Sequence, residues 1–349
     1  MKITIPESLR SITGPLLLTG HTGFKGSWMG LLLDSIGVEW VGISLPPEPD
    51  SLYSLLGQRN YTKEYFVDIR DYNQLNKIVK EVKPSFVIHL AAQPLVLDSY
   101  EQPRQTFETN VLGTVNLLDS LKDTGPSTRV VAATTDKVYR AKTLNSSYKE
   151  TDPWGGKDPY SWSKVGAEAA ISAWQQISST QGGPKLFSAR SGNVIGGGDR
   201  SKNRLLPDLV TGFISKSKIE IRNQNSTRPW QHVLDPLLGY LLVLSYNGFE
   251  SAFNFSPGVK SLKVEKVVQI ACKAWGEPVN INYLKHHDKF ETKSLSLNSN
   301  LAKKSLGWTS KWTQEESVIS TINWWKRVTS MSMTPKECCI ADIQELFVD

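Results

Sequence analysis

Two side chains with proton-transfer chemistry, Tyr160 and Lys164, stand four residues apart. Residues i and i+4 share one face of a helix, so the phenol and the amine would lie side by side. A tyrosine with a pKa of about 10 is a weak base at neutral pH, and a neighbouring cation favours its phenolate. The pair predicts removal of a hydroxyl proton while hydride leaves the same carbon. Taken alone, the spacing is common and usually belongs to a surface helix.

A second group of proton-transferring residues, Thr135-Asp136-Lys137, follows the apolar run at residues 129–133. Side chains at the carboxyl end of a parallel strand point into the binding crevice of an open sheet. The plain alternative for Asp136 and Lys137 is a surface ion pair, which contributes little. A simple dehydrogenase needs only a Ser or Thr beside Tyr160, so an added acid and an added amine indicate a second chemical step.

A glycine loop with the spacing GxxGxxG separates a short apolar run at residues 14–19 from a helical pattern that Gly37 ends. Such a loop turns tightly, lets a pyrophosphate approach, and offers it the amides of a helix N-terminus. It predicts a dinucleotide site, and a tight strand–helix turn is the plain alternative. The predicted cofactor contacts of this loop are Gly20, Thr22, Gly23, Phe24, Lys25 and Gly26.

The ends of later strands complete the predicted cofactor site. The second strand ends at Ile43-Ser44, without the carboxylate that usually holds the adenosine ribose, so we expect modest affinity. NAD is the expected cofactor and NADP stays open, with Lys25 either facing a 2′-phosphate or solvated on its loop. Further cofactor contacts are expected at Asp68, Ile69, Leu90, Ala91 and Ala92, with Tyr160 and Lys164.

Strand and helix patterns alternate through the first half of the chain. Strands are predicted at 14–19, 38–43, 66–68, 86–90, 129–133 and 186–190, and helices follow Gly26 and at 71–83, 105–122 and 160–178. This predicts an α/β fold, a Rossmann-type doubly wound parallel sheet with a smaller mixed α/β C-terminal substrate domain. We expect the dinucleotide-binding domain at 1–190, with a returning strand near 251–256, and the substrate domain at 191–349.

The second half carries less pattern. Residues 191–235 show little strand signal, and helices are expected near 236–247, 263–275 and 314–328. The last twenty residues have no clear period, which predicts a docked or mobile tail.

Composition narrows the function classes. The chain has 349 residues, 39% of them hydrophobic, which excludes a disordered protein. Three cysteines are too few for a disulfide framework or a four-cysteine zinc site. The net charge of +6 comes without a long basic run, so no nucleic-acid partner is expected. No signal peptide or membrane span is recognisable, and we expect a soluble cytoplasmic protein.

Several longer motifs, taken together, carry a resemblance to a known family. They are Gly20-His21-Thr22-Gly23-Phe24-Lys25-Gly26-Ser27-Trp28, His89-Leu90-Ala91-Ala92-Gln93-Pro94, Thr135-Asp136-Lys137, Gly155-Gly156-Lys157-Asp158-Pro159-Tyr160, Gly192-Asn193-Val194-Ile195-Gly196 and Thr227-Arg228-Pro229-Trp230-Gln231-His232-Val233. Over most of its length the chain resembles the extended short-chain dehydrogenase/reductases, and among them the CDP-glucose 4,6-dehydratases. The resemblance implies NAD as cofactor, CDP-glucose as substrate, and a homodimer or homotetramer built on the helices at 105–122 and 160–178.

The resemblance also implies roles for the proton-transfer residues. Thr135 would orient the 4-hydroxyl of the sugar and Tyr160 would take its proton. Lys137 would remove the C5 proton, and Asp136 would protonate the departing C6 hydroxyl, which gives CDP-4-keto-6-deoxyglucose. The active charge states need only a proton shift within the Asp136–Lys137 pair, which a dry pocket favours.

The nucleotide sugar is expected in the C-terminal half, because arginine meets phosphate oxygens in two places. The predicted substrate contacts are Gln93, Asn193, Arg204, Arg222 and Arg228, although a surface role stays open for each arginine. His89 and His232 are expected to be structural, since neither has a partner at metal-ligand spacing. Three residues, Leu97, Arg200 and Trp162, depart from the family pattern, and Trp162 is bulky enough to face the core.

Two other functions stay open. A 4-epimerase, or a dehydratase for another nucleotide, would use the same fold, but an epimerase needs no C5 base. A non-catalytic Rossmann protein could lose Tyr160, Lys164 or Asp136, and the chain has all three.

Overall fold

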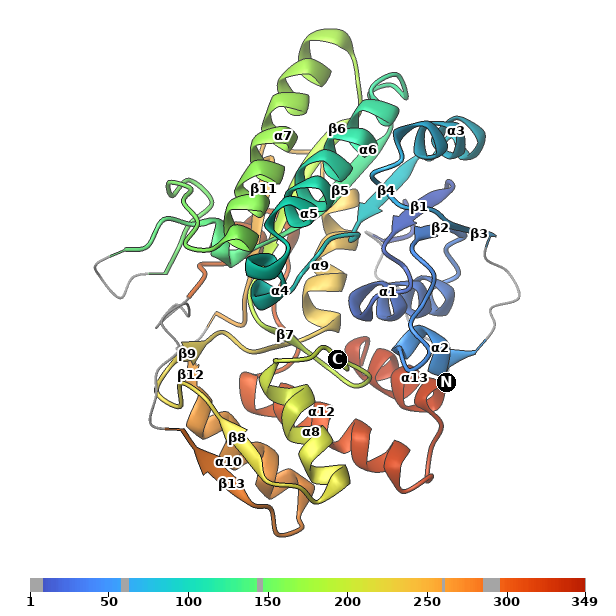
Figure 1. The fold of residues 1–349 in the computed structure, drawn as a ribbon. Helices are drawn as coiled ribbons and strands as arrows, with labels where there is room; N and C mark the ends of the chain where they lie inside the picture. The colour runs from blue at the N-terminus through green and yellow to red at the C-terminus, as the bar shows by residue number, and fades with distance from the viewer. Residues whose placement is uncertain (1–8, 58–62, 143–146, 259–260, 285–295, 349) are drawn as a thin grey trace.

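A seven-stranded parallel sheet forms the centre of this computed structural model, which describes residues 9–57, 63–142, 147–258, 261–284 and 296–348 (Figure 1). The strands lie in the order β11-β6-β5-β4-β1-β2-β3. Their bounds are β1 Leu16–Thr19, β2 Trp40–Ser44, β3 Lys63–Phe66, β4 Phe86–His89, β5 Arg129–Thr135, β6 Lys185–Ser191 and β11 Ala252–Phe255. The chain order reverses between β1 and β4, and ligands of open α/β sheets bind at such a switch point.

Helices cover both faces of the sheet, which explains why the inner strands β1 and β4 are mostly apolar. One layer holds α3 (Tyr72–Val82), α6 (Gly113–Leu121) and α7 (Pro159–Gln181), and the other holds α1 (Phe24–Ser35) and α9 (Leu234–Leu244). Alternate residues of β1 serve the two layers, because side chains of a strand point to opposite faces. Leu17 belongs to the first apolar layer, whereas Leu16 and Leu18 belong to the second.

The remaining elements are short pieces inserted in the sheet unit or lie in the second half of the chain. The first group is α2 (Leu52–Leu56), α4 (Val96–Glu101), α5 (Pro103–Phe107), the π-helix η2 (Glu108–Leu112) and the 3₁₀ turn η3 (Asp136–Val138). The second group is β7 (Val194–Ile195), α8 (Leu205–Ser215), β8 (Ile219–Ile221), β9 (Thr227–Arg228), β10 (Gln231–His232), β12 (Leu262–Lys263), α10 (Val264–Trp275), β13 (Ile281–Tyr283), α11 (Asn300–Leu306), α12 (Gln314–Thr329) and α13 (Pro335–Leu346).

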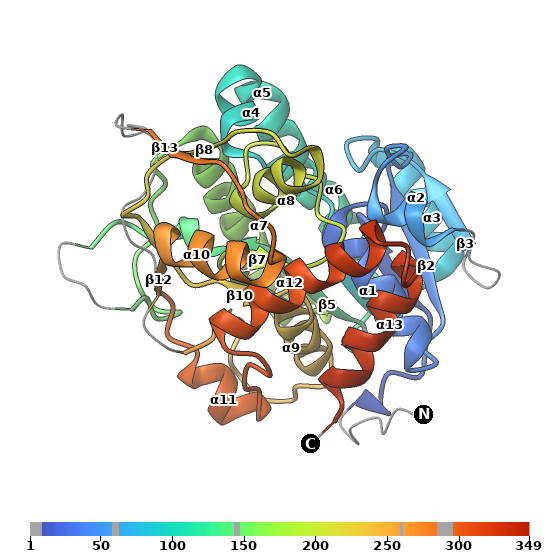
Figure 2. The ribbon, with the colours of Figure 1, turned by 90° about the horizontal axis from the view of Figure 1, so that it is seen from below.

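The second half of the chain packs across the end of the sheet unit. Three two-stranded pairs, β10–β7, β12–β9 and β13–β8, lie with α8, α10 and α12, and Figure 2 shows α10 beside α12. The strand expected near 251–256 is present as β11, which pairs with β6 at the edge of the central sheet. The domain division at residue 190 stays a prediction.

In four places the structure adds to the predicted elements or differs from them. The C-terminal segment, expected to be a docked or mobile tail, is docked, and residues 335–346 form the helix α13, which no sequence period indicated. The third strand spans residues 63–66, before the predicted 66–68. Residues 191–235, which show little strand signal, contain the short strands β7 to β10 as well as α8, and the helix predicted at 105–122 is preceded by α4 and interrupted by η2.

The caps of α13 explain why it forms. Thr334 and Glu337 make a reciprocal capping box, and Pro335 occupies the first turn, where its missing N–H costs nothing. Cys338, Cys339 and Ile343 are buried, and α13 packs on α1 and α2. All three cysteines of the chain are free thiols.

Two kinds of feature are absent from the described residues. None of their helices is long and apolar enough to cross a membrane. They also contain no group of three or more His, Cys, Asp or Glu side chains that could hold a metal ion.

Candidate active site

The glycine loop lies between the end of β1 and the start of α1, against the end of β4. Gly20 has a φ of +75°, and a Cβ there would lie 2.6 Å from the Ala91 nitrogen. A Cβ on Gly26 would lie 2.0 Å from the Gly20 oxygen. Glycine is therefore required at both positions, because the loop folds directly onto the backbone of its neighbours.

The N-terminus of α1 has the form of an anion site. Gly23 is its N-cap residue, and no side chain caps the helix, so its first amides are open to an external acceptor. Thr22 ties the loop to the end of β2, since its hydroxyl lies 2.7 Å from the Ser44 hydroxyl and donates to the Leu45 carbonyl at 3.0 Å. These residues fit the pyrophosphate of a dinucleotide.

The predicted adenosine contacts are only partly available to a cofactor. The Arg70 guanidinium holds both oxygens of the Asp68 carboxylate, and this lowers the pKa of Asp68. Ile69 is buried and packs against Gly113. Ser44 stands at the end of β2 where an acidic residue is usual, and its hydroxyl already contacts Thr22.

Lys25 differs from both sequence interpretations. Its ammonium donates to the Ser191 hydroxyl at 3.0 Å and to the Tyr240 hydroxyl at 3.4 Å. The prediction of a solvated lysine is wrong, because Lys25 lies in the first turn of α1 and turns inward toward α9. Burial of the ammonium and the nearby Arg204 lower its pKa to about 8.

Helix α7 brings the tyrosine and the lysine to the end of β5. Asp158 caps it by accepting from the Ser161 amide, and Pro159 begins its first turn. Tyr160 is buried, and burial raises its pKa to about 12, although a hydrogen bond with Thr135 opposes the shift. Burial and the nearby Lys25 lower the pKa of Lys164 to about 8, and Glu168 opposes them. Lys164 therefore gives up its proton more readily than a surface lysine.

Asp136 lies in the 3₁₀ turn η3, directly after β5, and is only 2% exposed. One carboxylate oxygen accepts from the Thr135 hydroxyl at 3.1 Å, and the other is buried without a hydrogen-bond partner. Burial raises the pKa of this carboxyl, and the charges of Lys137, Arg228 and Lys25 only partly offset it. A protonated Asp136 is therefore accessible, as a general acid requires.

The predicted substrate residues fall into two groups. Arg228 is buried near Asp136, and Arg204, at the start of α8, faces Tyr160 and Lys25. Arg222 is exposed and faces Asp208 of α8. Asn193 lies half-buried, with its carbonyl bound to the Gln231 amide.

Gln93 serves the loop after β4. Its amide nitrogen donates to Thr106 at 3.0 Å, and its side-chain oxygen accepts from the Leu95 amide at 2.5 Å. Its backbone is held by Asn110, so the Gln93 side chain shapes the loop on which any substrate contact would depend.

His89 has the position of a structural residue, as expected. It lies 2.7 Å from the Thr19 hydroxyl and 3.1 Å from the Thr114 hydroxyl, and burial lowers its pKa to about 3. His232 is also buried, with its ring 4.3 Å from that of Trp312.

The structure shows the surroundings of two residues that depart from the family pattern. Trp162 is 50% exposed, so the expectation that it faces the core is wrong. Arg200 lies over the Trp325 ring, 5.2 Å from its centre, which gives that arginine a packing role.

Sequence reasoning missed three residues of the site. Ser191 and Tyr240 hold the Lys25 ammonium, and the Ser99 hydroxyl accepts from the Tyr160 amide at 3.0 Å. Ser191 could have been suspected from its place at the end of a strand, whereas the other two carry no signal in the sequence.

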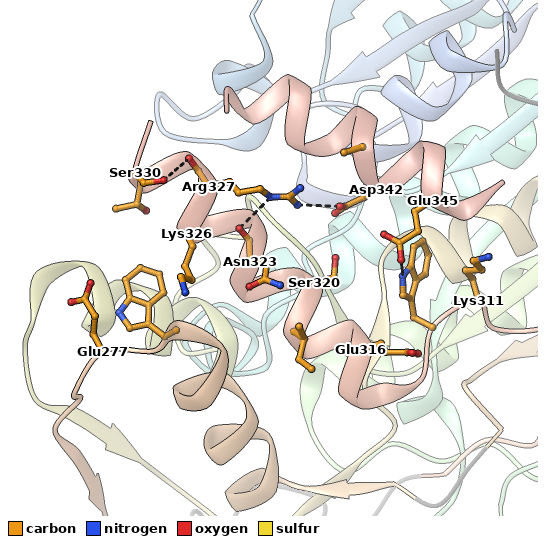
Figure 3. A pocket seen from close by; sticks show the side chains of 15 residues that line it. Glu277, Lys311, Glu316, Ser320, Asn323, Lys326, Arg327, Ser330, Asp342 and Glu345 are labelled. Carbon is orange, nitrogen blue, oxygen red and sulfur yellow. Dashed lines mark hydrogen bonds and ion pairs between the residues drawn. The ribbon is translucent and has the colours of Figure 1, made fainter. Parts of the chain in front are cut away.

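A cavity of about 880 Å³ lies elsewhere, between α10, α12 and α13 (Figure 3). Both acidic and basic side chains line it, among them Glu316, Lys326 and Arg327, and Arg327 donates to Asp342 at 3.4 Å. Its lining includes none of the predicted catalytic, cofactor or substrate residues.

The sheet order, the glycine loop and the Tyr160–Lys164 pair define a class, the Rossmann-fold short-chain dehydrogenase/reductases of the extended type. The chain belongs to the GDP-mannose 4,6-dehydratase family, whose model matches residues 17–321.

Individual relatives agree with this assignment. The chain is 40% identical over 323 residues to CDP-glucose 4,6-dehydratase of Salmonella typhimurium, covering 89% of this chain and 90% of that protein. It is 26% identical over 330 residues to dTDP-glucose 4,6-dehydratase of Xanthomonas campestris pv. campestris, covering 88% and 92%. The crystal structure of DesIV, a dTDP-glucose 4,6-dehydratase from Streptomyces venezuelae, covers 92% of this chain and 99% of its own with a TM-score of 0.80 at 22% identity. At that identity the last comparison shows the fold alone.

Proposed function

We propose that this protein is an NAD-dependent CDP-glucose 4,6-dehydratase that forms CDP-4-keto-6-deoxyglucose. The observation that carries the proposal is the 40% identity, over nine-tenths of both chains, to the Salmonella enzyme of that name. The site geometry supports the reaction type, because the acid Asp136 lies near Tyr160 at the end of β5 and the amine of Lys137 follows it in the same turn, whereas a simple dehydrogenase would use the tyrosine alone.

The cofactor would be held by the glycine loop, the open amides of α1 and the backbone at residues 90–92. Bound there, NAD would supply a hydride acceptor for C4 of the sugar and return the same hydride to C6. The close approach that Gly20 and Gly26 allow fits a pyrophosphate between the loop and the end of β4. Lys164, whose Nζ lies 3.4 Å from the Ala133 carbonyl, would reach the nicotinamide ribose.

Tyr160 takes the proton of the 4-hydroxyl. Its phenol is buried beside Thr135, whose hydroxyl orients the substrate oxygen. Because burial raises the pKa of Tyr160, the phenolate depends on positive charge; Arg204 supplies part of it, and Lys164, one helical turn further on, would add to it. A ketone at C4 then acidifies the proton at C5.

Lys137 and Asp136 eliminate water between C5 and C6. Lys137, as the neutral amine, removes the C5 proton, and Asp136, as the protonated acid, gives its proton to the departing C6 hydroxyl. Relative to the ionised pair this requires one internal proton shift and no change in total charge. Burial of Asp136, with one oxygen unpaired, favours the uncharged form.

The nucleotide diphosphate would bind on the C-terminal side of the crevice. Arg204 and Arg228 would make the main phosphate contacts. Arg204 lies near Tyr160 and Arg228 lies near Asp136, so both guanidinium groups stand beside the proton-transfer residues that the sugar must reach. Arg222 and Asn193 would contact the outer part of the nucleotide.

The protein would act in the cytoplasm as a homodimer or homotetramer, in deoxysugar biosynthesis such as that of lipopolysaccharide O-antigen. Three large apolar side chains on the helices after β4 and on α7 support a helical interface, since Phe107 is 41%, Leu112 54% and Trp162 50% exposed. Sedimentation compares the oligomeric state of the wild-type protein with that of the Leu112→Asp variant. A smaller assembly in the variant supports the helical interface, and an unchanged one contradicts it.

Incubation with NAD⁺ and CDP-glucose tests the reaction. A dehydratase gives a base-induced ketosugar absorbance with no net NADH, and deuterium from C4 arrives at C6 of the product. Formation of CDP-galactose would instead show a 4-epimerase, and binding without conversion a non-catalytic protein. CDP-, dTDP-, UDP- and GDP-glucose compared at equal concentration identify the nucleotide.

A further inference from the structure

A buried ion pair lies directly behind the proposed catalytic residues. Glu168 on α7 and Arg190 on β6 are 1% and 2% exposed. The guanidinium reaches both carboxylate oxygens, with Nε 2.8 Å from Oε1 and Nη2 2.7 Å from Oε2. Glu168 also accepts from the Thr134 hydroxyl at 2.5 Å and from the Ser188 hydroxyl at 2.6 Å. Four donors thus converge on one carboxylate.

The pair is fixed on its far side as well. Nη1 of Arg190 donates to the Tyr139 hydroxyl at 2.8 Å and to the Glu150 carbonyl at 3.0 Å. Tyr139 in turn donates to Asn254 of β11 at 2.7 Å. Arg190 is therefore held between β6, β11 and the segment after η3, and it holds Glu168 in place.

Three successive residues of β5 meet one face of α7. The Ala133 carbonyl accepts from Lys164, the Thr134 hydroxyl donates to Glu168, and Thr135 lies close enough to Tyr160 to lower the pKa of its phenol. Tyr160, Lys164 and Glu168 stand at i, i+4 and i+8, one above another on the helix. Glu168 is the furthest of these three residues along α7 and the only one that carries a carboxylate.

We propose that Glu168, held by Arg190, is a positioning residue that fixes α7 on the end of β5 and keeps the Lys164 ammonium charged beside Tyr160. The inference rests on the proposed function, because it says which residue positions the reacting groups Tyr160 and Lys164. A carboxylate one turn from a buried ammonium stabilises its charge, and a fixed helix register sets the distance from Tyr160 to Thr135.

The charges around Lys164 agree with this role. Lys25 from α1 disfavours its charge, Glu168 on its own helix favours it, and His89 of β4 is neutral, with its pKa lowered to about 3 by burial. Loss of Glu168 therefore removes the carboxylate that opposes burial and Lys25.

The test uses a variant that removes both charges, Glu168→Gln with Arg190→Met. Replacing a buried pair together avoids the isolated charge that a single change leaves. We expect an unfolding temperature near that of the wild type, a kcat for CDP-glucose lowered roughly 10- to 100-fold with little change in KM, and an alkaline limb of kcat moved down by about one pH unit. Wild-type kcat and an unmoved limb would overturn the proposal.

Glu168→Asp keeps the charge and shortens the side chain by one methylene. We expect it to fold, to lose kcat several-fold and to keep its alkaline limb, because the charge remains while the register is disturbed. If the double variant does not fold, this variant decides: reduced kcat with unchanged KM supports the role, and wild-type kcat contradicts it. Asp235→Asn, at a buried carboxylate held by Ser310 and Lys311, is the matched control that leaves the limb in place.

The two proposals fail in different ways. No conversion of CDP-glucose by the wild type contradicts the proposed function. The proton affinity of Lys164 is then read without substrate, from the pH dependence of its acetylation by mass spectrometry. A pKa in the Glu168→Gln, Arg190→Met variant equal to that of the wild type overturns the role of Glu168, and a lower one supports it.

Discussion

Two carboxylates, Asp136 and Glu168, are buried at the same end of the sheet, 2% and 1% exposed, and differ in what surrounds them. Asp136 accepts one hydrogen bond from the described residues, from Thr135, and its other oxygen is unpaired. Glu168 accepts four, two of them from the charged Arg190.

The difference appears in the direction of the two pKa values. Burial raises both, but the charge of Arg190 with the hydrogen bonds at Glu168 brings the pKa of that carboxyl below its usual range. At Asp136 burial prevails and the pKa stays raised. Although the two side chains are equally buried, Glu168 stays ionised and Asp136 can carry a proton. The number and charge of the hydrogen-bond donors around each carboxylate, and not its burial, decide its protonation state.

Asp136→Asn gives the largest expected effect. The amide keeps the shape but cannot give a proton to the C6 hydroxyl, so kcat for dehydration should fall roughly 10²- to 10⁴-fold. The free energy of unfolding should change by no more than about 1 kcal/mol, because Asp136 makes few hydrogen bonds. Steady-state kinetics and thermal unfolding check both parts. A large loss of stability would show that Asp136 resembles Glu168 and would remove the contrast.

Lys137→Ala separates elimination from oxidation. Without the amine, the C5 proton should no longer exchange with solvent, while oxidation at C4 by way of Tyr160 still occurs. We expect product formation to fall roughly 10²- to 10³-fold, with reduced cofactor accumulating on the enzyme. Proton NMR of the sugar in D₂O measures the exchange. Retained exchange at C5 would assign the base to another residue.

The motifs identified most of the chemistry because each depends on local spacing. The Tyr160–Lys164 pair needs only one helix, and Thr135–Lys137 needs only the end of one strand, which its apolar run indicates. The sheet followed from the same apolar runs. Helix α13 escaped prediction because its buried face includes two cysteines and Asp342, which give little hydrophobic period.

The remaining part of the site depends on contacts between elements distant in sequence. Lys25 turns inward because the hydroxyls of Ser191 and Tyr240 accept hydrogen bonds from its ammonium. These two residues stand 166 and 215 residues further along the chain. The role of Glu168 on α7 depends on its ion pair with Arg190, which lies on β6. From sequence alone, a charged residue on a helix with both polar and apolar residues is predicted to face solvent. Only the three-dimensional structure shows its buried partner, so no local sequence pattern identifies it.

Lys164 lies one helical turn before Glu168 on α7, and its titration should set the alkaline limb of the reaction. Burial lowers its pKa to about 8, so kcat should fall as pH rises through that value and the ammonium is lost. Above it we expect roughly a tenfold loss per pH unit. In Lys164→Arg the guanidinium keeps its proton, so the limb should move above about pH 9 even though turnover is lower. A limb at the same pH in that variant would assign it to another group.

Asp235 is the intermediate case and gives the smallest effect. Its carboxylate accepts from the Ser310 hydroxyl at 2.7 Å and the Lys311 amide at 2.6 Å, but has no bidentate arginine, and burial raises its pKa to about 6. A raised carboxyl pKa means that the fold favours the protonated form, so this group stabilises the protein below its unfolded pKa of about 4, and the contribution is lost as pH rises through about 6. Asp235→Asn keeps one acceptor and removes the titration. Its free energy of unfolding, relative to the wild type, should therefore rise by about 1 to 2 kcal/mol between pH 4 and pH 8. Urea unfolding at the two pH values measures this, and a difference of the opposite sign would place Asp235 with Glu168, among carboxylates that the fold holds ionised.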